Sequence, residues 1–165
     1  MSNALASLFK YKQWADAELL QAIGRMDETA QANNWHAAVR VMNHIRVVDE
    51  IFIGHLGGTA HGHSATNTVD TPSIAELSQL LQKTGQWYVN LCESLPFPML
   101  SEVLPFTFTD GDAGRMSREE ILLHVIAHGT YHRGAAGRVL VQSGLAAPRD
   151  LFTRFLHATE PSRRG

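Results

Sequence analysis

An all-α, up-down four-helix bundle is the fold class that this 165-residue sequence predicts. Three observations lead to this prediction. Four segments of about twenty residues each place apolar side chains at helical spacing. Two of these segments begin with Ser-x-x-Glu, which is typical of a helix N-terminus. Apolar residues make up 44% of the chain and charged residues 18%, a composition that can bury a core. We therefore expect a single domain over residues 1–165.

The four helices are expected over residues 3–26, 34–56, 73–95 and 117–143. The third and fourth begin at the serines of "SIAE" and "SREE", and Gly57-Gly58 ends the second. Counting at 100° per residue gives each helix an apolar stripe that should face the core. In the second helix the expected stripe is Ala37, Val41, His44, Val48, Ile51 and His55. In the fourth it is Ile121, Val125, His128, His132, Ala135 and Val139.

The connections are uneven in length, and long loops in a compact domain are often functional. The third and fourth helices are joined by a segment that contains "VLPFTFTDG", residues 103–111. Its alternation and its Asp-Gly pair predict a short strand or hairpin. A short tail helix is expected in "PRDLFTRFLHA", residues 148–158.

Composition and charge exclude several classes of protein. The net charge of −2 gives no electrostatic footprint for nucleic acid. No apolar run approaches the roughly eighteen residues of a membrane span, and the N-terminus lacks the pattern of a signal peptide. We therefore expect a cytoplasmic protein that binds neither nucleic acid nor membrane. The single cysteine, Cys92, cannot form an internal disulfide and is expected to be buried.

Histidine is the unusual residue of this chain, with nine copies. In "HVIAHGTYHRG" the residues His124, His128 and His132 follow one another at four-residue intervals. Three histidines at this spacing span roughly 12 Å of helix, so one ion can take only two adjacent ones. The pair at 128 and 132 straddles the expected stripe, and His44 lies in the stripe of the second helix. From spacing alone these side chains are either metal ligands or hydrogen-bonded core histidines.

The remaining histidines carry weaker signals. His55 is about 16 Å along the helix from His44, too far to share its ion, and is expected to be a core histidine. His124 flanks the stripe and has the same expectation. His61 and His63 lie in a loop rich in Gly, Ser and Thr, where they are either solvated or part of a lid.

Three stretches resemble the DinB/YfiT-like family. "YKQWADAELL" is similar to its opening helix, "VMNHIRVVDEIF" to its second-helix histidine segment, and "HVIAHGTYHRG" to its fourth-helix signature. The resemblance covers nearly the whole chain and implies a metal-binding four-helix bundle with His44, His128 and His132 as the ligands. The family commonly has glutamine after Arg-Gly, whereas this chain has Ala135. We expect that change to alter the wall of the pocket and not the ligand set.

The resemblance also implies two kinds of function. The first is a metal-dependent enzyme, a thiol-dependent S-transferase or a hydrolase, with one zinc, nickel or iron ion acting on a small-molecule substrate or a low-molecular-weight thiol. The second is a non-catalytic metal-binding protein of the stress response, or a bundle that binds a small ligand. Metal content and turnover distinguish these from each other and from a bundle without metal.

No general base is evident, because the chain lacks the His-Glu-x-x-His motif of metalloproteases. The catalytic candidates are Tyr131, which could reach the edge of the cavity, and Arg133, which could bind an anionic substrate or a carboxylate such as Asp49. Asp49 and Glu50 lie off the apolar stripe and are expected to be solvated or at an interface. Helical bundles with apolar edges often dimerise, so a homodimer is also expected.

Overall fold

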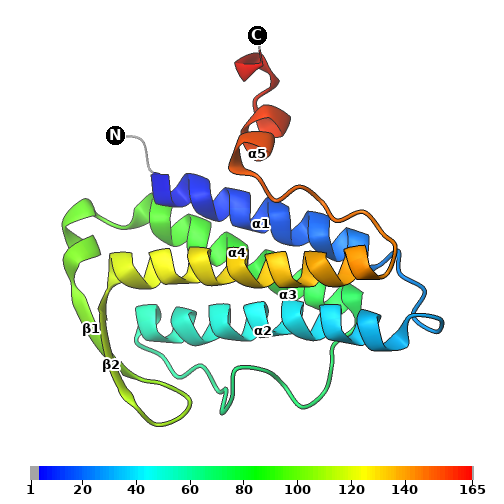
Figure 1. The fold of residues 1–165 in the computed structure, drawn as a ribbon. Helices are drawn as coiled ribbons and strands as arrows, with labels where there is room; N and C mark the ends of the chain where they lie inside the picture. Colours follow the sequence, from blue (N-terminus) through cyan, green and yellow to red (C-terminus); the bar gives the residue numbers. More distant parts are fainter. Residues whose placement is uncertain (1–3, 165) are drawn as a thin grey trace.

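The computed structural model describes residues 4–164. Four long helices pack side by side, as Figure 1 shows: α1 (Ala4–Ile23), α2 (Ala32–Gly57), α3 (Ile74–Ser94) and α4 (Arg118–Gln142). The four-helix bundle predicted from the sequence is therefore confirmed. The expected start of the first helix, at residue 3, lies outside the described residues.

The order of helix directions follows from the long connection between α2 and α3. Residues 58–73 run back along α2 before α3 begins, so α2 and α3 point the same way (Figure 1). We call this segment the crossover. As a result α1 and α4 are also parallel, and the directions read up-down-down-up, so the bundle is confirmed but the simple up-down alternation expected from the sequence is not. Each of α1 and α4 lies against its antiparallel neighbour, α3 and α2 respectively. Long crossover connections are a known way of building such bundles.

Local sequence signals define the helix ends. Ser73 and Ser117 each accept a hydrogen bond from the backbone N–H three residues later, and Glu76 and Glu120 reach back to close the capping box. Gly58 ends α2 in the left-handed conformation, as expected.

The predicted hairpin also forms. A short 3₁₀ helix (Phe97–Ser101) leads into β1 (Val103–Thr107), which pairs antiparallel with β2 (Ala113–Ser117) at one end of the bundle. The tail helix α5 (Phe152–Thr159) projects from the bundle in Figure 1 and precedes a 3₁₀ turn (Pro161–Arg163). It begins later than the residue 148 expected from the sequence.

The interior has three layers along the bundle axis. Two apolar clusters form the outer layers: one includes Leu19, Met42 and Leu140, and the other includes Phe9, Phe52 and Val125, while a third, smaller cluster joins α5 to α1. Between the two outer layers lies a layer of buried polar and charged side chains. Its members are Lys12, Asp16, Asp49, Thr84 and Arg133.

Candidate metal centre

Three histidines meet where α2 and α4 lie side by side. His44 comes from α2, and His128 and His132 come from successive turns of α4. One ligand nitrogen from each lies within 4.8 Å of the others. The ring centroid of His44 lies 4.9 Å from that of His128 and 4.5 Å from that of His132. Among residues 4–164 this is the one group of three or more potential ligands that is this compact.

The spacing of the nitrogens fits a first-row transition metal. The Nε2 atoms of His44 and His128 are 3.0 Å apart. Two imidazole nitrogens bound about 2.05 Å from a tetrahedral zinc ion lie roughly 3.3 Å apart, and at right angles around an ion roughly 3 Å. The three-histidine cluster can therefore hold a metal ion with only small movements of the rings. Three protein ligands also leave at least one position for water or substrate.

The crossover fixes the ring of His44. Its Nδ1 lies 2.7 Å from the backbone carbonyl oxygen of Thr66. A carbonyl oxygen only accepts hydrogen bonds, so Nδ1 must carry the proton and Nε2 presents its lone pair to the cluster. The crossover is itself anchored to α2, because the buried side chain of Asn43 donates to Asn67 and Thr68. Hydrogen bonds of this kind orient metal-binding histidines in general.

The cluster keeps its two α4 histidines, His128 and His132, uncharged. Burial, with the neighbouring imidazoles of His132 and His44 acting in the same direction, lowers the pKa of His128 to about 3. Burial, followed by the neighbouring His44, also lowers the pKa of His132. Both rings are therefore neutral at pH 7, and a neutral imidazole is the form that binds metal. The Nδ1 atom of His128 is buried and has no hydrogen-bond partner in the described part of the chain.

The histidines lie at the rim of the buried face of α4, not at its centre. The centre is formed by Val125, Gly129, Arg133 and Ala136, whereas Ala135 of the expected stripe is exposed. The predicted stripe was wrong by about one residue. A count of apolar side chains does not identify Gly129 and Arg133 as buried, because glycine has no side chain and arginine is charged. On α2 the expected stripe fails in the same way, since Ala37 is exposed and Asn43 and Asp49 are buried.

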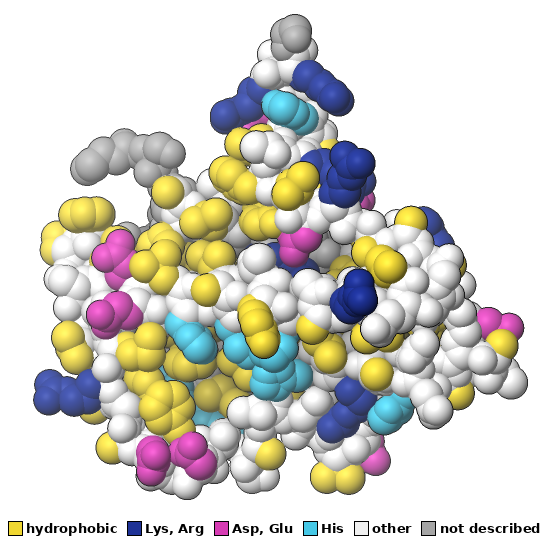
Figure 2. Space-filling view, in the orientation of Figure 1, with side chains coloured by type: hydrophobic (Ala, Val, Ile, Leu, Met, Phe, Trp, Pro, Cys, Tyr) yellow, Lys and Arg dark blue, Asp and Glu magenta, His cyan; other side chains and the backbone are white. Residues whose placement is uncertain are grey.

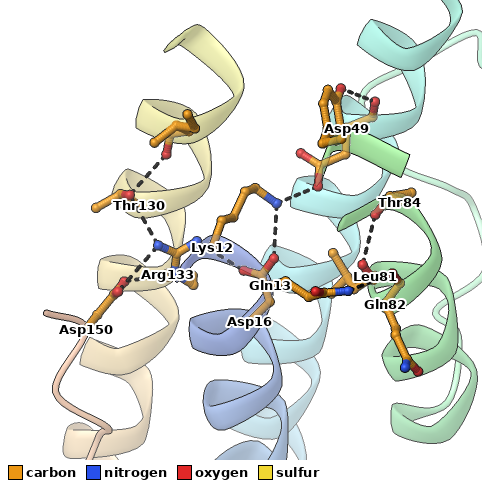
Figure 3. A network of polar contacts seen from close by, with 12 residues as sticks. Lys12, Gln13, Asp16, Asp49, Leu81, Gln82, Thr84, Thr130, Arg133 and Asp150 are labelled. Atoms are coloured by element: carbon orange, nitrogen blue, oxygen red, sulfur yellow. Dashed lines mark hydrogen bonds and ion pairs between the residues drawn. The ribbon is translucent and has the colours of Figure 1, made fainter. Parts of the chain in front are cut away.

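Beneath the cluster lies a network of buried ion pairs (Figure 3). The Lys12 ammonium group is 2.5 Å from Asp49 Oδ2 and 3.0 Å from Asp16 Oδ2. The guanidinium group of Arg133 is 3.1 Å from Asp16 Oδ1 and 2.8 Å from Asp150 Oδ2. The expectation that Asp49 is solvated was wrong, because this side chain is fully buried. Its charge is accommodated by Lys12, which the sequence analysis did not single out.

The two catalytic candidates lie in different environments. Tyr131 is 76% exposed, and its ring packs edge-on against His132 with centroids 5.0 Å apart. The side chain of Arg133 is only 1% exposed and faces inward. Arg133 does bind carboxylates, but they are those of Asp16 and Asp150 and not that of Asp49.

The other histidines extend away from the cluster toward the hairpin. The ring of His124 lies 5.7 Å from that of His128 and 4.9 Å from that of Phe52. His55, expected in the core, is only half-buried, and its Nε2 has no partner within residues 4–164. In the crossover, His63 Nε2 lies 2.6 Å from a carboxylate oxygen of Glu50.

Sequence reasoning missed the residues that support the cluster. The contribution of Thr66 is a backbone carbonyl, which leaves no residue-specific signal. Lys12 and Asp16 share a helix face at four-residue spacing, but such a pair is also typical of exposed helices. The sequence feature that distinguishes Lys12 and Asp16 from such an exposed pair is that both lie in "YKQWADAELL", the stretch that resembles the opening helix of the family.

The described residues contain no helix that is both long and apolar enough to cross a membrane. A helical bundle with a three-histidine cluster able to hold a metal ion defines the class of protein. Comparison with known proteins identifies the family, because the DinB family model matches residues 1–164. The chain therefore belongs to the DinB family. It is also 23% identical over 173 residues to the curated protein named Protein DinB from Bacillus subtilis (strain 168), with 99% of each chain covered.

Proposed function

We propose that this protein is a metal-dependent enzyme that binds one zinc, nickel or iron ion through His44, His128 and His132. Its reaction would be the transfer of a group to a low-molecular-weight thiol, or a hydrolysis. The observation that carries the proposal is the convergence of three imidazoles, whose ligand nitrogens lie within 4.8 Å of one another, at the rim of the bundle. A bound ion of this kind lowers the pKa of a thiol or of water that occupies its open position.

The protein's own groups prepare the site for the ion. The Thr66 carbonyl holds the proton of His44 on Nδ1, so Nε2 is free to bind metal. In the metal-free protein a proton between the two Nε2 atoms of His44 and His128 accounts for their 3.0 Å separation. Metal binding requires that proton to move from His128 Nε2 to Nδ1 of the same ring, which keeps the imidazole neutral and frees Nε2 for the ion. Protonation of the imidazoles competes with the metal, so we expect metal affinity to fall at acidic pH.

The surroundings also fit a small substrate. The rim position leaves the histidines half-buried, so a thiol or an electrophile has access from the α2–α4 side. Tyr131 stands beside His132 and is the candidate for contact with a bound substrate. Arg133 supports α4 through its inward ion pairs, and we assign it a positioning role.

Metal analysis tests the first half of the proposal. We expect about one equivalent of transition metal in the untagged wild-type protein and its loss in His128→Ala. His124→Ala is the matched control, because His124 lies one turn away on the same helix and outside the cluster. Wild-type protein that takes up no zinc, nickel or iron would refute the metal site.

Turnover tests the second half. The metal-loaded protein is assayed with a panel of low-molecular-weight thiols and electrophiles, and in parallel with esters and amides. We expect activity that is lost in His128→Ala and retained in His157→Ala, which replaces an exposed histidine of the tail helix α5. Full metal loading without turnover across the panel would favour the alternative, a non-catalytic metal-binding protein of the stress response or a small-ligand-binding bundle.

A further inference from the structure

A row of aromatic and imidazole rings leads from the metal cluster to the hairpin. From His128 the row continues to His124, then to the buried ring of Phe52. Phe52 contacts both His55 and Phe106, with centroids 5.6 Å and 5.9 Å away. Every step between neighbouring rings is shorter than 6 Å, so the row forms one continuous surface. We call this surface, from His124 to Phe106, the furrow.

The furrow is open on the side that Figure 2 displays. Histidine and hydrophobic side chains gather there in a hollow between α4 and α2, next to the hairpin. His124 is exposed, and His55 and Phe106 are half-buried. The rings are therefore accessible at their edges while Phe52 forms the floor, with 4% of its surface exposed.

The hairpin is shaped to bring Phe106 over α2. A Cβ atom at Gly114, which faces Phe106 across the two strands, would lie 2.6 Å from the Phe106 ring. Only glycine permits this close approach, and the ring then stacks on His55 with centroids 4.6 Å apart. Phe106 is thus held as one wall of the furrow by the sequence of the opposite strand.

The furrow carries no free charge among these rings. Burial lowers the pKa of His55, and the neighbouring His61 lowers it further, so His55 is neutral at pH 7. Two arginines lie at the hairpin end. The guanidinium group of Arg118 is bound by Glu102 and by the Leu56 carbonyl. Arg115 follows Gly114 on β2, so strand alternation places its exposed side chain on the face opposite Phe106. A charged guest would lose its hydration here without gaining a partner.

We infer that the furrow binds an uncharged aromatic group of the substrate whose reacting end lies at the metal cluster. This inference rests on the proposed function, because it names the class of substrate for that same site. Aromatic rings pack well against other rings and against neutral imidazoles at such distances. The continuity of the furrow with His128 places the guest beside the reacting end and not at a separate site.

Hydroxamates test the inference, since the hydroxamate group binds an open metal position and its substituent can be varied. We expect cinnamohydroxamate to bind the zinc-loaded protein about tenfold more tightly than acetohydroxamate. A carboxylate at the para position of the ring should abolish the gain. Equal affinities of cinnamohydroxamate and acetohydroxamate would overturn the inference, and a retained gain with the carboxylate would overturn the restriction to uncharged groups.

Two phenylalanine variants separate the furrow from general effects of an aromatic ligand. Phe106→Ala should remove most of the gain in affinity while acetohydroxamate binds as before. Phe97→Ala is the control, because Phe97 is 73% exposed and outside the furrow, and it should retain the full gain. An unchanged gain in Phe106→Ala would refute the assignment of the furrow.

The metal-free protein keeps the two proposals distinguishable. Cinnamyl alcohol has no metal-binding group, and we expect it to shift the ring-proton NMR signals of His55 and His124 without any ion. If the protein takes up no metal but shows these shifts, the proposed function fails and the furrow stands. If metal binds and cinnamyl alcohol shifts neither signal, the furrow fails and the metal site stands.

Discussion

Replacement of Lys12 by methionine should destabilise the protein strongly through one particular carboxylate. Lys12 is 2% exposed and holds both Asp16 and Asp49. In the variant Asp16 keeps its ion pair with Arg133. Asp49 Oδ1 already lacks a partner in the described residues, and Oδ2 would lose the lysine as well. The fully buried Asp49 carboxylate would then be left without compensation.

The magnitude follows from the burial of the pair. Removing one partner of a buried ion pair costs about 3–5 kcal/mol, because the remaining charge keeps its desolvation penalty. Methionine fills most of the lysine volume, so little of the loss comes from a cavity. We expect the free energy of unfolding, measured in urea with an unchanged m-value, to fall by about 3–5 kcal/mol.

Double variants identify the responsible carboxylate. Lys12→Met with Asp49→Leu removes both members of the pair and should recover stability to within about 1–2 kcal/mol of wild type. The Tyr88 hydroxyl bonds only to the Asp49 backbone carbonyl, so that contact survives. Lys12→Met with Asp16→Leu should not recover, because Asp49 stays uncompensated. Equal recovery in both double variants would refute the reasoning.

The same variant has a defined pH dependence. Burial raises the pKa of Asp49 to about 6 although Lys12 lowers it, and loss of Lys12 should raise it further. A carboxyl group whose pKa is higher in the folded than in the unfolded protein costs stability as pH rises between the two values. The deficit of Lys12→Met relative to wild type should therefore be full at pH 8 and shrink toward pH 5. A deficit that grows on acidification would contradict this mechanism.

Three further predictions concern the cap, the thiol and the helix contact. Ser117→Ala should lower the free energy of unfolding by about 1 kcal/mol in urea titrations. By NMR, the pKa of Glu120 should rise only part of the way toward 4.5 in that variant, because the Ser117 backbone N–H, the larger cause of its lowered pKa, remains and only the side-chain hydrogen bond is lost. Cys92 should resist thiol reagents at about pH 8 until the protein is unfolded, since burial raises its pKa to about 12; rapid labelling of the folded protein would contradict its burial. Gly129→Ala should lower the melting temperature, because the new Cβ would lie 2.7 Å from the buried lysine chain. Gly134→Ala, with no atom within 4 Å, should leave the melting temperature unchanged or raise it.

Much of the fold could be predicted because its signals are local. Ser73 and Ser117 define helix starts through their own side chains, and the alternation of apolar and polar residues over 103–111 predicts the hairpin. The direction of α3 could not be predicted from such signals. It depends on whether the crossover turns back at once or runs the length of α2, and its sequence is compatible with both.

The candidate site was predicted in part, and the missed part is the polar layer. The four-residue spacing identified His128 and His132, and the family resemblance favoured His44 as their partner. The same reasoning predicted that Asp49 is solvated or at an interface, because a polar residue off the apolar stripe is usually exposed. A buried charge is recognisable only through its partner, and Lys12 lies 37 positions away in the sequence.

The polar layer and the metal cluster lie at the same level of the bundle, and their charges are related. The ammonium group of Lys12 is one of the charges that lower the pKa of His128, so it is close enough to oppose a bound cation. The layer together with Asp150, which binds Arg133 from its outer side, counters this with three carboxylates (Asp16, Asp49, Asp150) against two cations (Lys12, Arg133), a formal charge of −3 + 2 = −1.

This balance predicts how the double variants bind metal. Lys12→Met with Asp49→Leu removes one charge of each sign and leaves the layer with Asp150 at −1, so its zinc affinity should stay within about threefold of wild type. Asp150→Asn leaves Arg133 paired with Asp16 but brings the charge of the layer and residue 150 together to zero, and it should bind zinc more weakly. Competition with a chelator at pH 7 measures both. If the double variant folds but loses the ion, the layer supports the histidines through packing and not through its charge.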